Sequence, residues 1–174
     1  MRHVLMFALT VLCAVPVSAQ TTIVASSRPQ PPRAVSLSGP RFGFTALGDG
    51  VVEKLAERDI VIRPSITQFG WQFENQITGL GGGLTAVNEW VVLAGGLEQG
   101  VVIPSVSWLV GLRTKEGTEF GVGPNVTPAG VALAFAAGVT IKAGALNIPM
   151  NIAVVPSKHG TRISFMTGFN ISRR

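Results

Sequence analysis

The chain has 174 residues, of which 47% are hydrophobic and only 13% are charged, with 21 glycines and no tyrosine. This length suffices for one domain of ordinary size, and the scarcity of Lys, Arg, Asp and Glu argues against the charge-rich surface of a typical soluble domain. The formal net charge of +5 is spread along the chain without a basic block interleaved with aromatic residues, which argues against nucleic-acid binding.

The first 19 residues have the features of a signal peptide. A short basic start precedes an apolar run over residues 4–17, and residues 17–19 (VSA) offer a small-residue cleavage site. A lipoprotein signal using Cys13 is an alternative, although Leu12 stands where a small residue is preferred; an uncleaved anchor is another. Each alternative implies export. Cleavage after residue 19 would lower the net charge to +4 and remove Cys13, so the mature chain would have no disulfide.

Residues 20–39 are rich in Ser, Pro and Arg, including the stretch RPQPPR at 28–33, and show no periodicity. This composition predicts a flexible leader, and we favour a plain linker over a binding tail. Residues 40–172 are then assigned to one structured domain.

From residue 40 onward the dominant pattern is alternation with a period of two, which is typical of β-strands. The pattern is clearest in the last third, where the odd positions from Val131 to Ile141 are mostly bulky and apolar while the even positions are small or polar. Short turns between the last three segments predict an antiparallel meander. The predicted strands are residues 41–47, 66–77, 86–97, 102–113, 119–127, 131–141, 146–154 and 163–171.

A short helix is predicted between the first two strands, over residues 51–58 (VVEKLAER). Val51, Val52 and Leu55 can share one face while the charged residues face water, and Asp49 could cap the helix. About two turns of helix are too short to be stable unless they dock on the rest of the domain. Turns or loops are predicted at residues 79–83, 98–100, 114–118 and 127–130.

These elements predict an all-β fold, an antiparallel up-and-down β-barrel of about eight strands with one short helix in the first long connection. If the bulky faces point inward, the protein is a soluble, lipocalin-like periplasmic barrel that binds an apolar ligand. If they point outward, they meet lipid, and small or polar residues fill a narrow interior. Interior glycines favour the second alternative, whereas the strand prolines Pro104, Pro124 and Pro149 favour the first. An open barrel that pairs with other copies through strand edges is a third possibility.

With the bulky faces outward, several charged residues fall on the interior face. We predict that they form a paired polar network inside the barrel, because a buried charge without a partner costs several kcal/mol. A structural role is favoured over a conducting path. The candidate residues are Arg41, Glu74, Glu89, Arg113, Glu119 and Arg162.

The last strand contains Phe165-Met-Thr-Gly168-Phe169-Asn-Ile171. With the signal peptide and eight alternating strands, it resembles the small outer-membrane β-barrels of the OmpA and OmpX type over roughly residues 41–171. The chain departs from that pattern by continuing through residues 172–174 and by having few aromatic residues. The stretches QFGWQFE and GVGPN are also similar to exported bacterial proteins without a known activity. The resemblance implies an outer-membrane location, both termini on the periplasmic side, and an external connection over residues 47–64 where a protein partner could bind.

The residues needed for common catalytic or metal chemistry are scarce. Outside the predicted signal peptide there is one histidine, His159, in the turn 156–160, and no cysteine, so the usual zinc or iron sites cannot be built. The glycines of residues 79–83 have neither the lysine nor the strand–helix context of a phosphate loop. We therefore predict a non-enzymatic structural or interaction protein without catalytic residues, metal or cofactor, whose expected partner besides protein is membrane lipid.

Overall fold

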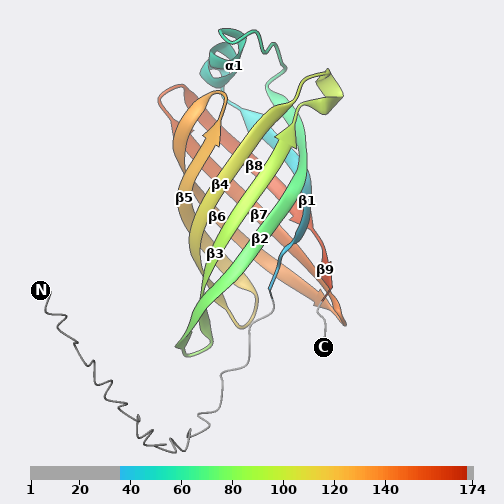
Figure 1. Ribbon diagram of the computed structural model, residues 1–174, viewed down its shortest axis with the longest axis vertical. Helices are drawn as coiled ribbons and strands as arrows, with labels where there is room; N and C mark the ends of the chain where they lie inside the picture. Colours follow the sequence, from blue (N-terminus) through green and yellow to red (C-terminus); the bar gives the residue numbers. More distant parts are fainter. Residues whose placement is uncertain (1–35, 172–174) are drawn as a thin grey trace, which may run out of the picture. The chain divides into compact units, whose positions relative to one another are not determined.

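The computed structural model describes residues 36–171, which form a closed, eight-stranded antiparallel β-barrel (Figure 1). Among β1 to β8, neighbours in sequence are neighbours in the sheet, and the barrel closes because β1 pairs with both β2 and β8. The predicted fold class is confirmed, and closure leaves no free strand edge of the kind required by the open-barrel alternative. The strands are β1 (Gly39–Leu47), β2 (Ser65–Gly81), β3 (Leu84–Gly95), β4 (Ile103–Thr114), β5 (Thr118–Thr127), β6 (Gly130–Ala143), β7 (Leu146–Ser157), β8 (Gly160–Gly168) and the short β9 (Asn170–Ile171).

The strand boundaries differ from the sequence prediction mainly at the turns. β2 and β3 extend through most of the predicted loop 79–83 and leave only Gly82 and Gly83 as the turn, where both glycines have positive φ. The predicted turn at residues 98–100 is part of a 3-10 helix, η1 (Leu97–Gln99), flanked by glycines with φ of 83° and 75°. The predicted last strand is divided, because β8 ends at Gly168 and β9 then pairs with β7.

Two of the strand prolines, Pro124 and Pro149, lie where the ladder of paired residues is interrupted, whereas Pro104 pairs with Ala94 in the continuous β3–β4 ladder. Pro124 is in register with Leu133 of β6, but the pairing of β5 with β4 lapses at residues 123 and 124. Pro149 pairs with Thr140 of β6 and lies where β7 passes from β8 to β9. At Pro124 and Pro149 the N–H group that proline lacks is therefore missing where no ladder bond has to be made.

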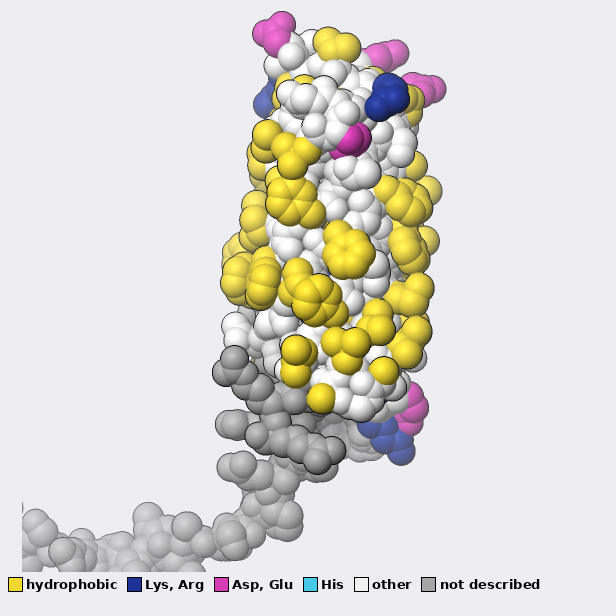
Figure 2. Space-filling model, turned by 90° about the vertical axis from the view of Figure 1, so that its right-hand side faces the viewer, with side chains coloured by type: hydrophobic (Ala, Val, Ile, Leu, Met, Phe, Trp, Pro, Cys, Tyr) yellow, Lys and Arg dark blue, Asp and Glu magenta, His cyan; other side chains and the backbone are white. Residues whose placement is uncertain are grey.

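The bulky side chains of the alternating strands point out of the barrel. Figure 2 shows hydrophobic side chains over the middle of the visible face and charged ones gathered toward the two ends. The third strand follows the same rule: Trp90 and Val92 are 45% and 42% exposed, whereas Val87 and Glu89 are buried. Because strand side chains alternate between faces, the interior receives the small and polar positions.

Helix α1 (Asp49–Ala56) covers one end of the barrel, at the top of Figure 1. It begins directly after Gly48 without a side-chain cap, so the predicted capping by Asp49 is wrong; Asp49 is instead the first helical residue. Val51 and Leu55 are almost fully buried. They pack with apolar residues of the barrel mouth and of the connection to β2, and this packing explains how an eight-residue helix is stable. The apolar cluster consists of Leu47, Val51, Leu55, Ile62, Ile66 and Ile103.

The opposite end of the barrel carries both ends of the described chain. Leu37, in the last part of the predicted leader, is 2% exposed, and the main-chain oxygen of Ser38 accepts a hydrogen bond from Asn170 Nδ2 at 2.7 Å. Residues 36–38 are thus held against the barrel. The predicted signal peptide and the rest of the leader lie outside the described residues.

Candidate functional site in the barrel interior and at its capped mouth

All six candidate interior residues are buried, with at most 7% of each exposed. They stand at alternate strand positions whose side chains point inward. The remaining charged residues of the range 36–171 lie in α1, the connections and turns, or at a strand end. Three arginines and three glutamates therefore share the interior, and their formal charges balance as a set.

Arg113 is the centre of one interior cluster. Its guanidinium donates two hydrogen bonds to Glu74, with Nη1–Oε1 and Nη2–Oε2 distances of 2.6 and 2.5 Å. It also donates to Glu119 Oε2 from Nε at 2.9 Å and from Nη2 at 2.5 Å, and Glu89 Oε1 lies 3.3 Å from Nη2. Such paired contacts between a planar guanidinium and carboxylates are strong and geometrically specific.

Neutral groups complete the surroundings of this cluster. Asn151 Nδ2 donates to the second oxygen of Glu119, and a Cβ on Gly138 would overlap the Asn151 amide, so glycine makes room for that contact. Arg41 donates to Gln72 Oε1 at 3.0 Å and to two main-chain oxygens near the start of β1, and within the described residues it forms no ion pair. The Arg113 cluster therefore holds three carboxylates against one directly bonded guanidinium and is the anionic part of the interior.

The structure does not bring Arg162 into the Arg113 cluster. Its Nη1 donates to Thr127 Oγ1 at 2.7 Å, and its buried Nε has no hydrogen-bond partner. Among residues 36–171 no ion pair involves Arg162. Its position near the start of β8 places it at the α1 end of the barrel, away from the carboxylates that the sequence prediction grouped with it.

A cavity of about 100 Å³ occupies the interior between these two charged regions. Arg41 and Glu89 contribute to its lining, as does Arg162, while Val51 and Leu55 of α1 help close it at the mouth. A cavity of this size has room for several water molecules but is smaller than the roughly 300–1,000 Å³ of typical small-molecule sites. The apolar part of its wall includes Leu109, Ala134 and Val155.

Hydroxyl and amide side chains form hydrogen bonds with one another along the cavity wall. Thr45 Oγ1 lies 2.5 Å from Gln68 Oε1 and 2.7 Å from Ser164 Oγ. On the other side, Asn125 Nδ2 donates to the hydroxyls of Ser105 and Ser107, both at 2.9 Å. These neutral contacts connect strands across the interior and suit a structural role.

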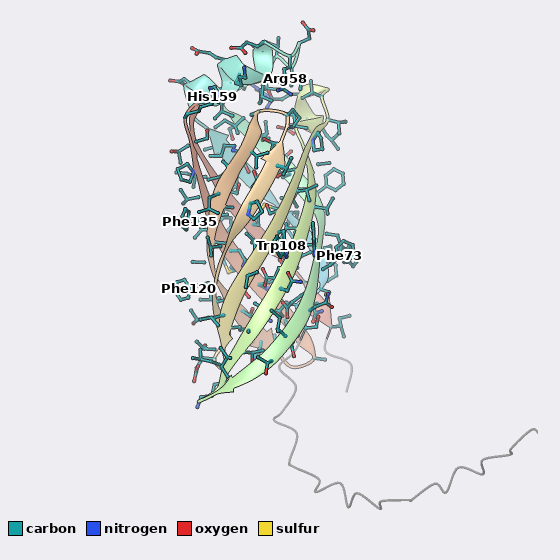
Figure 3. All side chains as sticks on the ribbon, turned by 60° about the vertical axis from the view of Figure 1, so that its left-hand side comes forward. Arg58, Phe73, Trp108, Phe120, Phe135 and His159 are labelled. Atoms are coloured by element: carbon teal, nitrogen blue, oxygen red, sulfur yellow. The ribbon has the colours of Figure 1, made fainter. Side chains whose placement is uncertain are left out.

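A second hollow, of about 460 Å³, lies at the rim of the barrel next to α1, between the β5–β6 and β7–β8 turns. We call it the basic groove; its polar lining comes from Lys54, Arg58, Lys158, His159 and Arg162, together with Ser157. Figure 3 shows Arg58 and His159 at the same end of the barrel. Sequence reasoning placed Lys54 and Arg58 in water and His159 in a turn, and it did not group them. The predicted closure of the barrel could have grouped these residues, because closure brings the β1–β2 connection beside the β7–β8 turn.

The described residues show no arrangement suited to holding a metal: no group of three or more His, Cys, Asp or Glu side chains within residues 36–171 could do so. In the same range no helix has the length and apolar character needed to cross a membrane, a finding that does not concern strands. Comparisons with protein-family models, curated proteins and solved structures found no match to this chain. The closed eight-stranded barrel is the part of the OmpA/OmpX resemblance that the structure establishes.

Proposed function

We propose that this protein is a non-enzymatic outer-membrane β-barrel with a structural or interaction role. The observation that carries the proposal is the distribution of side chains, with bulky apolar groups outside the barrel and charged, polar or small groups inside. Phe69, Trp71 and Val139 are each about half exposed, whereas Arg113 and its three carboxylate partners are buried. A large exposed apolar surface marks an interaction site, and a continuous apolar exterior around a closed barrel suits lipid.

The lengths of the strands support the same proposal. The eight main strands have between 9 and 17 residues, and a tilted strand needs about 9–11 residues to cross a bilayer. On the outer surface, the indole N–H of Trp108 has a hydrogen-bond partner on the neighbouring strand, because Trp108 Nε1 donates to Asn88 Oδ1 at 2.5 Å. In hydrocarbon an unsatisfied N–H group costs several kcal/mol, so this local partner is useful there.

A soluble periplasmic barrel that binds an apolar ligand is the second candidate, and the partly apolar interior cavity is the observation that favours it. That candidate needs most bulky side chains inside. The large side chains of β6 point outward, including Phe135 at 49% exposure, and the cavity of about 100 Å³ is small for a lipid. We therefore rank it below the membrane barrel.

The connection between β1 and β2 is the proposed interaction surface. It contains α1 and is by far the longest connection among the described strands. In the proposed orientation the chain ends lie in the periplasm and α1 faces outward from the cell. A protein partner is proposed to bind this connection, and nucleic acid is not proposed as a partner.

The first experiment is fractionation of the expressed, processed protein, with carbonate washing of the membranes. We expect the protein to stay in the outer-membrane pellet and to migrate differently on gels with and without boiling, because a closed barrel resists unfolding by detergent. Release into the soluble periplasmic fraction together with a bound apolar molecule would contradict the proposal and support the second candidate.

A pair of substitutions sharpens this experiment. Val139→Arg places a charge in the apolar band and should cost about 2–4 kcal/mol of membrane stability if that position faces the bilayer interior. Val61→Arg is the matched control, because Val61 is 78% exposed in the α1 connection, outside the band. Membrane integration lost with Val139→Arg and retained with Val61→Arg supports the proposal, whereas two equally well-integrated proteins would contradict it.

A further inference from the structure

The starting observation is Arg162, a buried guanidinium without a carboxylate partner among the described residues. It is 7% exposed, bonds one neutral hydroxyl and leaves its Nε without an acceptor. Arg113, in the same barrel, is bonded to three carboxylates. Because an uncompensated buried charge is costly, Arg162 is a place where an anion from outside the chain would be stabilised.

Arg162 also lines the basic groove, where it is joined by three further cations. Lys54 lies in the last turn of α1 and Arg58 in the turn that follows the helix, and both line the groove. Lys158 comes from the β7–β8 turn, and half-buried His159 lies beside it. Four acids belong to the β1–β2 connection, of which Glu57 lies 2.5 Å from Lys54; the others are Asp49, Glu53 and Asp59. None of the four lines the groove, whose lining thus has four permanent positive charges and no carboxylate.

The apolar side of the groove continues onto the outer surface of the barrel. Val131 lines the groove and is 71% exposed at the start of β6. Phe135 stands four residues further along the same outward row, and in Figure 3 His159, Phe135 and Phe120 follow one another down one edge of the barrel. The basic groove therefore lies at the end of a continuous apolar face.

That apolar face contains its own hollow, of about 530 Å³, on the outside of β4 to β7. It forms around Ala137, a small residue in an outward row of large ones. Ala137 pairs with Phe120 of β5 and with Ile152 of β7, so larger side chains stand on both sides of it. A flexible hydrocarbon chain fits such a shallow channel between bulky side chains.

We propose that the basic groove binds the phosphate headgroup of a membrane lipid, whose acyl chains lie on the outer face of β5 to β7. This inference rests on the proposed outer-membrane location, which places the groove at headgroup level and the Ala137 hollow at acyl-chain level. Arg162 and the three surrounding cations supply the charge for a phosphate group, and Arg is well suited to phosphate oxygens. A free phosphate would use the basic groove alone, without the adjoining apolar face.

The experiment uses the full mature chain in bilayer discs of phosphatidylcholine, into which phosphatidic acid is titrated, and bound lipid is counted by native mass spectrometry. The test variant is Lys54→Gln with Arg58→Gln. The matched control is Lys115→Gln with Lys142→Gln, which removes the same charge from the opposite end of the barrel, where both residues are exposed. Arg162→Gln is a third variant, and unboiled gel mobility shows whether each protein has folded.

We expect the test variant and Arg162→Gln each to weaken phosphatidic acid binding by about fivefold for every cation removed, and the control pair to leave it unchanged. Equal weakening by test and control pairs would show non-specific attraction and overturn the proposal. Inorganic phosphate bound as tightly as the lipid, measured by phosphorus NMR, would overturn the lipid assignment. If carbonate washing instead releases the wild-type protein, the proposed location has failed, and the phosphate measurement on the soluble protein still shows whether the groove binds an anion.

Discussion

Arg113 and Arg162 are both buried inside the same barrel, yet their surroundings are opposite. Arg113 lies toward the end of the barrel where the described chain begins and ends, and it is bonded to Glu74, Glu89 and Glu119. Arg162 lies at the α1 end, bonds only Thr127 among the described residues and borders a groove lined by other cations. The difference shows that burial of an arginine does not by itself define its role.

The Arg113 cluster takes the place of a hydrophobic core in its part of the interior, because one guanidinium binds three carboxylates and these contacts join strands β2, β3, β4 and β5. The surroundings of Arg162 leave a positive charge to be compensated from outside. The first arrangement suits stability and the second suits binding. Four predictions test this contrast, from the largest expected effect to the smallest.

Removal of the Arg113 guanidinium should destabilise the barrel most. Arg113→Met leaves three buried carboxylates without their shared cation, and the free energy of unfolding should fall by about 3–5 kcal/mol. Urea unfolding of the folded barrel in detergent measures this change. Adding Glu74→Gln and Glu119→Gln should restore most of the loss. A single Arg113→Met variant as stable as the wild type would contradict a stabilising role for the cluster.

Gly50→Ala should loosen the α1 cap that closes the barrel mouth beside Arg162. A Cβ at Gly50 would lie 2.3 Å from the main-chain oxygen of His159, so α1 must move away from the β7–β8 turn. We expect destabilisation of about 1–3 kcal/mol, although alanine normally favours a helix over glycine. Hydrogen exchange of the α1 amides measures the loosening. Glu53→Ala, at an exposed position of α1, is the control and should leave exchange unchanged.

Arg162→Met should change stability by less than about 1 kcal/mol in the absence of an anionic lipid. The lost hydrogen bond to Thr127, worth about 1 kcal/mol, is offset by removal of a buried unpaired charge. The same urea titration used for Arg113→Met gives the comparison directly. A loss as large as that of Arg113→Met would mean that Arg162 is compensated within the chain, and the contrast between the two arginines would be lost.

Glu98 tests whether neutral donors alone can hold a charge at the α1 end. Thr67 donates to it from the main-chain nitrogen at 3.0 Å and from Oγ1 at 2.5 Å, and these bonds lower the pKa of Glu98 from 4.5 to about 2. Because the folded-state pKa is the lower one, the stabilisation is present above about pH 4.5 and is lost as the pH falls towards 2. An NMR titration of the Glu98 carboxyl measures this pKa. Thr67→Val should raise the pKa, and an unchanged value would show that the hydroxyl contributes nothing.

The sequence alone supports the fold prediction to an unusual extent. Alternation in segments such as 131–141 predicted both the strands and which side chains share a face, because a strand places successive residues on opposite faces whatever its neighbours are. The same local rule selected all six buried charged residues of the described chain. It also identified Val51 and Leu55 as one face of a helix that had to be docked.

The partners of those residues were not predictable from the alternation. Glu74 and Arg113 are 39 residues apart in sequence, and their contact depends on strand register, tilt and closure of the barrel. Arg162, like Arg113, is an arginine at an inward-pointing position of the alternating pattern, but its place near the start of β8 puts it at the other end of the interior. The separation of one predicted network into two charged regions is therefore a property of the tertiary structure.

The basic groove is the clearest example of what only the fold decides. Lys54 and Arg58 belong to the first connection and Lys158 to the last turn, so no local pattern joins them. The pairing of β1 with β8 closes the barrel and brings those two connections together. By itself the sequence determined the strands, their faces and the inward charges, because these follow from backbone geometry over a few residues; the tertiary structure decided which charges are compensated and which face a ligand, because that depends on contacts between distant strands.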